Sequence, residues 1–187
     1  ERMRGDLLRL DRTVQQVLSA ARAEESGRRA RLAPVSLREL LGECIAGLRG
    51  RHGLPDEAVS LALARDLVVR GDRGELAVVF RNLLENAVKY SDAPVSVSVR
   101  VGGDGEGRVS IEISDRGIGI PSGELRKIFG RFYRAGRDVQ RTASGLGLGL
   151  FIVRNLVRRQ GGRVVAKSEG SGAGSRFVVT LRTAPPS

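Results

Sequence analysis

The chain has 187 residues, of which 41% are hydrophobic and 28% are charged, so it can bury the core of one globular domain. This composition excludes a wholly disordered chain and a fibrous protein. The formal net charge of +11, from 32 Lys and Arg against 21 Asp and Glu, indicates an anionic partner but does not distinguish nucleic acid, phospholipid and nucleotide phosphates.

The first 26 residues predict a helix that packs in a bundle or coiled coil. Apolar residues recur at alternating spacings of four and three, at Met3, Leu7, Leu10, Val14, Val17 and Ala21. No later segment repeats this pattern, so we expect a second copy of the chain or a segment outside it to supply the partner helix. An amphipathic helix lying on its own domain is the alternative. The start inside a helical pattern, without Met, predicts a piece of a longer protein.

A basic linker, residues 27–31, separates that helix from the rest, so we divide the chain into residues 1–31 and 32–187. We predict helices over 37–48, 72–90 and 146–160, the first capped by Ser36. Strands are predicted over 34–36, 59–64, 67–70, 95–101, 108–114, 163–168 and 176–181. The last four strands form two hairpins, which argue against a doubly wound parallel sheet. They favour an α+β, two-layer sandwich whose mixed, mostly antiparallel sheet is covered on one face by helices.

The single cysteine, Cys44, lies in an apolar helical stretch and predicts a packed thiol compatible with a reducing compartment. No apolar run approaches the length of a membrane span, and no signal-peptide core is present in these residues.

Two segments carry residue types suited to a nucleotide. On the helix over 72–90, Asn82, Asn86 and Lys89 share one face. Amide oxygens suit Mg²⁺ and a lysine suits phosphate, although a merely solvated face would look the same. Directly after the strand over 108–114, Asp115 can accept a hydrogen bond from an exocyclic amine such as that of adenine, and the glycines that follow permit close approach.

Two further segments lie in a basic stretch, since residues 121–160 hold nine basic and two acidic residues. Residues 127–134 form a cluster of aromatic and arginine side chains. Residues 145–150 alternate glycine and leucine and lead into a helix, whose first N–H groups can receive phosphates. The spacing is not that of a P-loop, and the strand that precedes a dinucleotide-binding loop is missing.

In this order and spacing, the four segments resemble the N, G1, F and G2 boxes of sensor histidine kinases, within the wider family of Bergerat-fold ATPases. The similarity covers roughly residues 34–182, and the helix before it resembles the second helix of the family's dimerisation and phosphotransfer domain. The resemblance implies ATP and Mg²⁺ as cofactors. It also implies transfer of the γ-phosphate to a histidine of the dimerisation domain, for relay to a response regulator.

By this resemblance, Asn86 coordinates Mg²⁺, Asn82 lies beside it, Lys89 meets phosphate and Asp115 reads the adenine amine. The loop from Arg131 to Ser144 would be the mobile ATP lid. Its Arg131 and Arg134 are candidates for the γ-phosphate. Further residues are expected to line the pocket: Tyr90, Gly117, Gly119, Ile120, Phe132, Gly145, Leu146, Gly147, Leu148, Gly149 and Ser175.

His52, the only histidine, lies in a glycine-rich turn and lacks the acidic residue that follows the family's phosphoacceptor. We therefore expect His52 to be a loop residue, and the acceptor histidine to lie outside this chain. The chain should then bind ATP without phosphorylating itself. By resemblance, it is the cytoplasmic domain of a homodimeric protein anchored in the inner (plasma) membrane of a bacterium.

Three alternatives stay open. An ATP hydrolase of the same fold is disfavoured, because those relatives carry a catalytic Glu where this chain has Asn82, and Glu85 points elsewhere on the helix. A nucleotide-binding sensor without kinase activity is the second. The third, a nucleic-acid-binding module, is disfavoured because no recognised motif is present and only 4% of residues are aromatic, so no specific nucleic acid is expected.

Overall fold

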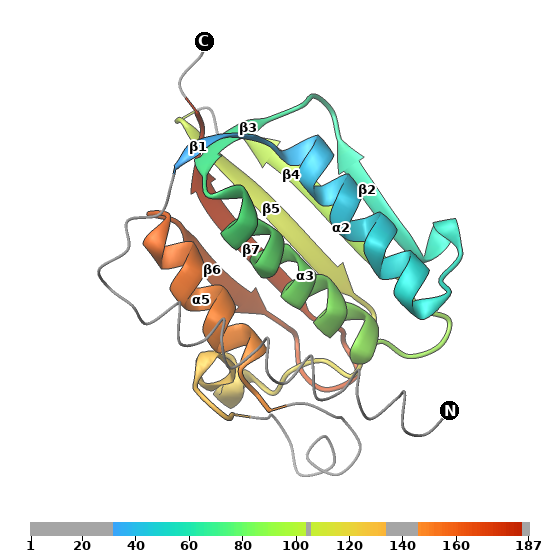
Figure 1. Cartoon of the computed structure of the whole chain (residues 1–187). Coiled ribbons are helices and arrows are strands. Elements are labelled where there is room, and N and C mark those ends of the chain that lie inside the picture. The colour runs from blue at the N-terminus through green and yellow to red at the C-terminus, as the bar shows by residue number, and fades with distance from the viewer. Residues whose placement is uncertain (1–31, 104–105, 134–145, 185–187) are drawn as a thin grey trace, which may run out of the picture.

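The computed structural model describes residues 32–103, 106–133 and 146–184, so the predicted helix of residues 1–26 and the linker after it lie outside the described residues. Three helices cover one face of a five-stranded sheet (Figure 1): α2 (Leu37–His52), α3 (Arg73–Lys89) and α5 (Gly149–Arg159). The strands are β1 (Ala33–Ser36), β2 (Val59–Leu63), β3 (Val68–Gly71), β4 (Val97–Gly103), β5 (Arg108–Asp115), β6 (Arg163–Lys167) and β7 (Arg176–Arg182). The predicted α+β two-layer fold is confirmed.

The sheet is mixed but mostly antiparallel, as predicted. Its strand order is β2-β4-β5-β7-β6, in which only the β2–β4 pair is parallel. Both predicted hairpins form, as β4–β5 and β6–β7. β1 and β3 make a separate two-stranded sheet that meets the end of β7 through a bridge between Val69 and Thr183.

The core lies between the helices and one face of the sheet. Along β5, Val109, Ile111 and Ile113 are buried while the residues between them are more exposed, as the period of two requires. The α3 residues Leu83 and Leu84 are fully buried against that face. Burial of these alternating and helical stripes supplies the main free energy of folding, at about 25 cal/mol for each Å² of apolar surface removed from water.

Two predicted helix boundaries were wrong by more than two residues. α2 continues to His52, four residues beyond the predicted end at residue 48, because Gly53, at φ 59°, provides the left-handed cap. His52 is therefore the last residue of a helix and not a loop residue. α5 begins at Gly149 rather than at residue 146, because Gly147 has φ 69°, a conformation that no helix contains.

The strands β2 and β3 form where predicted but do not pair with each other, since β2 joins β4 and β3 joins β1. None of the helices within the described ranges is both long and apolar enough to cross a bilayer.

Candidate nucleotide-binding site

Asp115 stands at the end of β5 and is held there by hydrogen bonds. Its Oδ1 accepts from the backbone N–H of Gly117 at 2.9 Å and of Ser175 at 3.1 Å, and its Oδ2 accepts from the Ser175 hydroxyl at 2.5 Å. The residue is 9% exposed. A buried carboxylate is costly unless it is hydrogen-bonded, and these three donors satisfy it. One orientation of the carboxylate is thereby held, which leaves lone pairs on Oδ2 for a further donor.

Two glycines after Asp115 let the backbone come close to neighbouring segments. A Cβ at Gly117 would collide with the carbonyl oxygen of Tyr90, the residue that ends α3. Gly119, at φ 69°, would place a Cβ on the carbonyl oxygen of Gly170. The end of β5 is in this way joined to the end of α3, which brings the predicted adenine and metal residues to one region of the fold.

Asn82, on the polar face predicted on α3, lies toward α5. The Asn82 side-chain amide donates to the carbonyl of Val78 at 2.8 Å, and a Cβ at Gly149 would lie 2.9 Å from its Oδ1. The start of α5 therefore passes directly over Asn82. Asn86, one turn further along, is half-buried, and its amide makes no hydrogen bond within the part of the chain that the structure describes.

Lys89 and Tyr90 lie together at the end of α3, with Nζ of Lys89 4.8 Å from the centre of the Tyr90 ring. Arg131 lies over the ring of Phe151 in α5, also at 4.8 Å. These two contacts place one cation at the end of α3 and one against a ring of α5, which suits a polyanionic ligand.

The remaining predicted residues divide into buried and exposed groups. Ile120 and Leu148 are buried, and the backbone N–H of Ile120 donates to the Ser168 hydroxyl. Leu146 and Phe132 are exposed, Phe132 to 68% and at φ 56°. Two predicted residues, Arg134 and Gly145, lie outside the described residues.

These residues fit Mg-ATP. The described residues contain no cluster of three His, Cys, Asp or Glu side chains that could hold a metal by itself. Mg²⁺ ordinarily takes few protein ligands and completes its shell with water and substrate phosphates, so a single amide oxygen such as that of Asn86 is a suitable protein ligand.

A polar clamp between α3 and α5 was missed from the sequence. Gln160, only 4% exposed, accepts at Oε1 from the backbone N–H of Asp72, and Arg159 pairs with Glu75 at 3.1 Å. Burial raises the pKa of the Glu75 carboxyl, which the Arg159 charge partly offsets. Nothing in a sequence shows that a glutamine at a helix end caps another helix 88 residues away, so only the structure could reveal the clamp.

The opposite side of α3 faces α2 and belongs to a different cluster. The Glu85 carboxylate is hydrogen-bonded to His52 Nε2 at 2.7 Å and paired with the Arg51 guanidinium at 2.9 Å. Burial would raise the pKa of Glu85, but these hydrogen bonds outweigh it and hold the pKa below its usual value. The prediction that Glu85 points away from Asn82 is confirmed.

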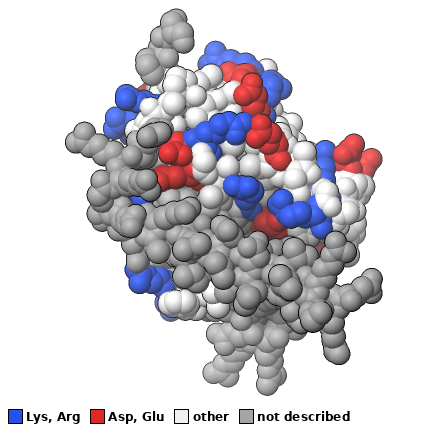
Figure 2. All heavy atoms as spheres, viewed as in Figure 1, with Lys and Arg blue, Asp and Glu red and all other residues white. Residues whose placement is uncertain are grey.

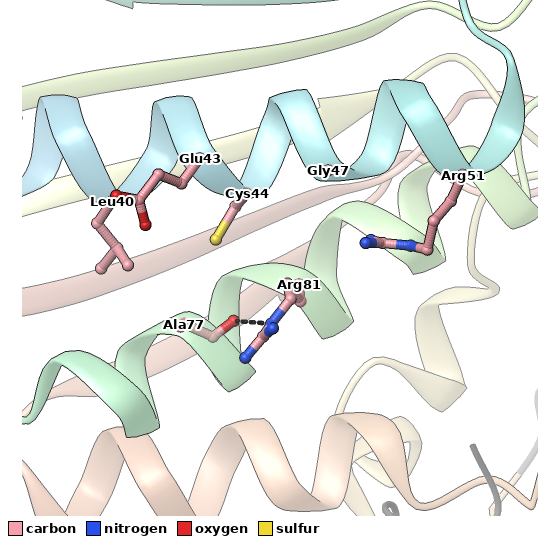
Figure 3. Close-up of a pocket in the computed structure, with 7 residues that line it drawn as sticks. All are labelled: Leu40, Glu43, Cys44, Gly47, Arg51, Ala77 and Arg81. Carbon is pink, nitrogen blue, oxygen red and sulfur yellow. Dashed lines mark hydrogen bonds between the residues drawn. The ribbon is translucent and has the colours of Figure 1, made fainter. Parts of the chain in front are cut away.

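Next to this cluster lies a groove of about 270 Å³ between α2 and α3 (Figure 3). Cys44, Gly47 and Ala77 line it, and Arg81 bonds back to Ala77. Burial raises the pKa of the Cys44 thiol, so this is the packed thiol that the sequence predicts.

The fold and this site define a nucleotide-binding domain with helices on one face of a mixed sheet. The family described as histidine kinase-, DNA gyrase B-, and HSP90-like ATPase matches residues 71–185. The sensor histidine kinase AtsR of Burkholderia thailandensis is 32% identical over 186 residues, which cover 97% of this chain and 30% of that protein. The chain spans between 30% and 48% of the length of the first curated relatives it matches.

Two solved structures share the fold. Full-length ShkA in complex with AMPPNP has a TM-score of 0.78 and 28% identity, and the match covers 100% of this chain and 38% of ShkA. The mycobacterial sensor histidine kinase MprB has a TM-score of 0.70 and 27% identity, covering 83% of this chain and 99% of that one. The chain belongs to the histidine kinase-, DNA gyrase B- and HSP90-like ATPase family. Within that family it is an ATP-binding catalytic domain of the histidine kinase type.

Proposed function

We propose that this chain binds Mg-ATP between α3, the end of β5 and the start of α5, and transfers the γ-phosphate to a histidine on the dimerisation domain of a longer protein. The observation that carries the proposal is the junction of the two predicted boxes, in which Gly117 after Asp115 lies against Tyr90 at the end of the helix that holds Asn86. The relatives named above are sensor histidine kinases, and ShkA was solved with an ATP analogue.

At the adenine end, Asp115 would accept a hydrogen bond from the exocyclic amine. Its Oδ1 already accepts two backbone donors, while Oδ2 accepts only the Ser175 hydroxyl. A carboxylate oxygen can accept about two hydrogen bonds, so Oδ2 is the atom that can accept one more, from the amine. Ser175 then acts as a positioning residue, because it holds Oδ2 in place.

At the phosphate end, Asn86 would supply the amide oxygen to Mg²⁺, which neutralises the phosphates when bound. Lys89 and Arg131 are the cations that would meet the triphosphate, and the first N–H groups of α5 add the positive end of a helix dipole. Phosphoryl transfer depends mainly on position and neutralisation of charge, which these residues are arranged to provide.

The acceptor imidazole is proposed to come from outside these 187 residues. His52 is the only histidine here, and it contacts Glu85 on the α2 side of α3, away from Asn82 and Asn86. Residues 1–31 are proposed to belong to the dimerisation domain and residues 32–187 to form the catalytic domain. The full protein is proposed to be a homodimer anchored in the bacterial inner membrane, with a response regulator as the final phosphate acceptor.

Hydrolysis of ATP is the less favoured reaction. The Asn82 amide, which bonds to Val78, cannot act as a base, and Glu85 is occupied by His52 and Arg51.

The test is transfer of radiolabel from γ-labelled ATP. We expect no label on the chain alone and label on the dimerisation domain of the parent protein when it is added as a separate polypeptide. Label on His52 of the isolated chain, or release of inorganic phosphate faster than transfer, would contradict the proposal.

A further inference from the structure

The face of the sheet opposite α2, α3 and α5, on which no helix of the described residues lies, is strongly basic. In the alternating pattern of β4, β5 and β7, the residues between the buried ones point to this open face, and the register of β6 with β7 places Arg163 and Lys167 on the same side. The strands place six basic side chains there and one carboxylate, Glu112. The basic residues are Arg100, Arg108, Arg163, Lys167, Arg176 and Arg182, and all six are exposed.

The opposite side of the molecule has a different charge pattern. On the helix side, acidic side chains lie among basic ones (Figure 2), and several are ion-paired, such as Glu43 with Arg73 and Glu75 with Arg159. A uniform excess of arginine over the whole surface would not separate the charges in this way. The open face therefore carries a charge pattern of its own.

The register of the strands makes this pattern costly to the fold. Lys167 lies directly opposite Arg176, and Arg108 directly opposite Arg182. Like charges that face each other across neighbouring strands destabilise a sheet. Glu112 offsets part of this cost, at 3.6 Å from Arg176 and 3.4 Å from Arg100. Such a pattern is explained most simply by a partner that neutralises it.

The shape of the face selects the kind of partner. Arg176 and Arg182 are six residues apart, which is about 20 Å along β7, and β4 and β6 are three strand spacings apart, about 14 Å. Apart from Glu112, the side chains between these charges are short: Ser98, Ser110, Ser114, Val165, Val178 and Thr180. The long cationic side chains therefore reach further than anything else on the face.

Among the described residues, no aromatic side chain lies on this face to stack on bases, and no described helix lies on this side of the sheet to enter a DNA groove. Its two valines are too small an apolar centre for an ordinary protein interface. The partner that fits such a face is a planar array of anions. We propose that the open face binds the headgroups of an anionic phospholipid bilayer. This binding is independent of the ATP site, which lies at the end of β5 and among the helices.

The test is co-sedimentation of the whole chain with vesicles. Equimolar phosphatidylglycerol and phosphatidylcholine should retain the chain, pure phosphatidylcholine should not, and high salt should release it. The double substitution Lys167→Gln and Arg176→Gln should weaken binding about 25-fold, since each basic residue near an anionic surface contributes roughly fivefold. Arg163→Gln with Arg182→Gln is the replacement pair if the first does not fold.

The matched control is Arg65→Gln with Arg70→Gln, which removes the same charge from exposed positions outside this face. We expect the control to keep most of the vesicle binding. Equal weakening by both double substitutions would show that only net charge matters and would overturn the proposal. So would failure of the wild-type chain to bind anionic vesicles, or a selective effect of Lys167 and Arg176 on duplex DNA binding alone.

Discussion

Replacing Asp115 with Asn separates the structural role of this carboxylate from its proposed role toward adenine. The amide oxygen can still accept from the N–H groups of Gly117 and Ser175, and the amide nitrogen can donate to the Ser175 hydroxyl, which also accepts. All three bonds survive but lose their charge. A charged hydrogen bond contributes about 1 kcal/mol more than a neutral one, and relief of the buried charge offsets part of this loss.

We therefore expect Asp115→Asn to lower the free energy of unfolding by about 1–2 kcal/mol, which corresponds to a fall in Tm of roughly 2–8 °C for a chain of this size. The effect on ATP should be larger. An amide NH₂ at the Oδ2 position would face the amine of adenine, donor against donor, and a loss of about 2.7 kcal/mol corresponds to about 100-fold weaker binding.

The assays are thermal unfolding and calorimetric titration with Mg-ATP, with Ser175→Ala as the control. That control removes only the hydroxyl bond to Oδ2, so it should lower stability by about 1 kcal/mol and weaken ATP binding by less than about tenfold. If Asp115→Asn lowered Tm as expected and left ATP affinity unchanged, Asp115 would be structural only and the adenine assignment would be wrong.

Three further substitutions test other parts of the structure. Gly50→Ala should raise the free energy of unfolding by about 0.5–1 kcal/mol, measured by urea denaturation, because a Cβ there meets open space in α2. Gly119→Ala should cost more than about 2 kcal/mol and abolish Mg-ATP binding, because its Cβ would meet the carbonyl of Gly170 at positive φ; a fully stable variant would contradict the observed backbone. Glu85→Gln should lower stability by about 1 kcal/mol at neutral pH through loss of its ion pair with Arg51 and weakening of its hydrogen bond with His52. Since the folded pKa of Glu85 is lowered, this stabilisation is present above the usual value of 4.5 and is lost as pH falls through the folded pKa, so a difference between the two proteins that persisted in acid would refute the assignment.

The elements predicted from the sequence are those whose apolar pattern is regular over many residues. α3 was found within a residue at each end because its buried positions recur at helical spacing and Asp72 caps it. The β4–β5 and β6–β7 hairpins were found because their strands alternate and are close in sequence. The pairing of β2 with β4 was not predicted, because it joins strands that are separated by β3 and α3.

The site was predicted in the same uneven way. The residue types and spacing of Asn82, Asn86, Lys89 and Asp115 identified the boxes, but the hydrogen bonds of Ser175 to Asp115 depend on a contact 60 residues away. The Gln160 clamp carried no signal at all. A linear count assigned the charge surplus to residues 121–160, whereas the basic face of the sheet appears only when alternate residues of four strands are placed side by side.

The central claim is that this chain binds Mg-ATP through the amide of Asn86 and the carboxylate of Asp115. Its most direct test is calorimetric titration of Mg-ATP into the wild-type chain and into Asn86→Ala. Asn86 is half-buried, and its side chain bonds to none of the described residues, so the truncation breaks no hydrogen bond among them. We predict saturable, magnesium-dependent binding to the wild type and at least about tenfold weaker binding to Asn86→Ala, equivalent to about 1.4 kcal/mol or more. No binding by the wild type, or equal affinity of the two proteins with and without Mg²⁺, would contradict the account.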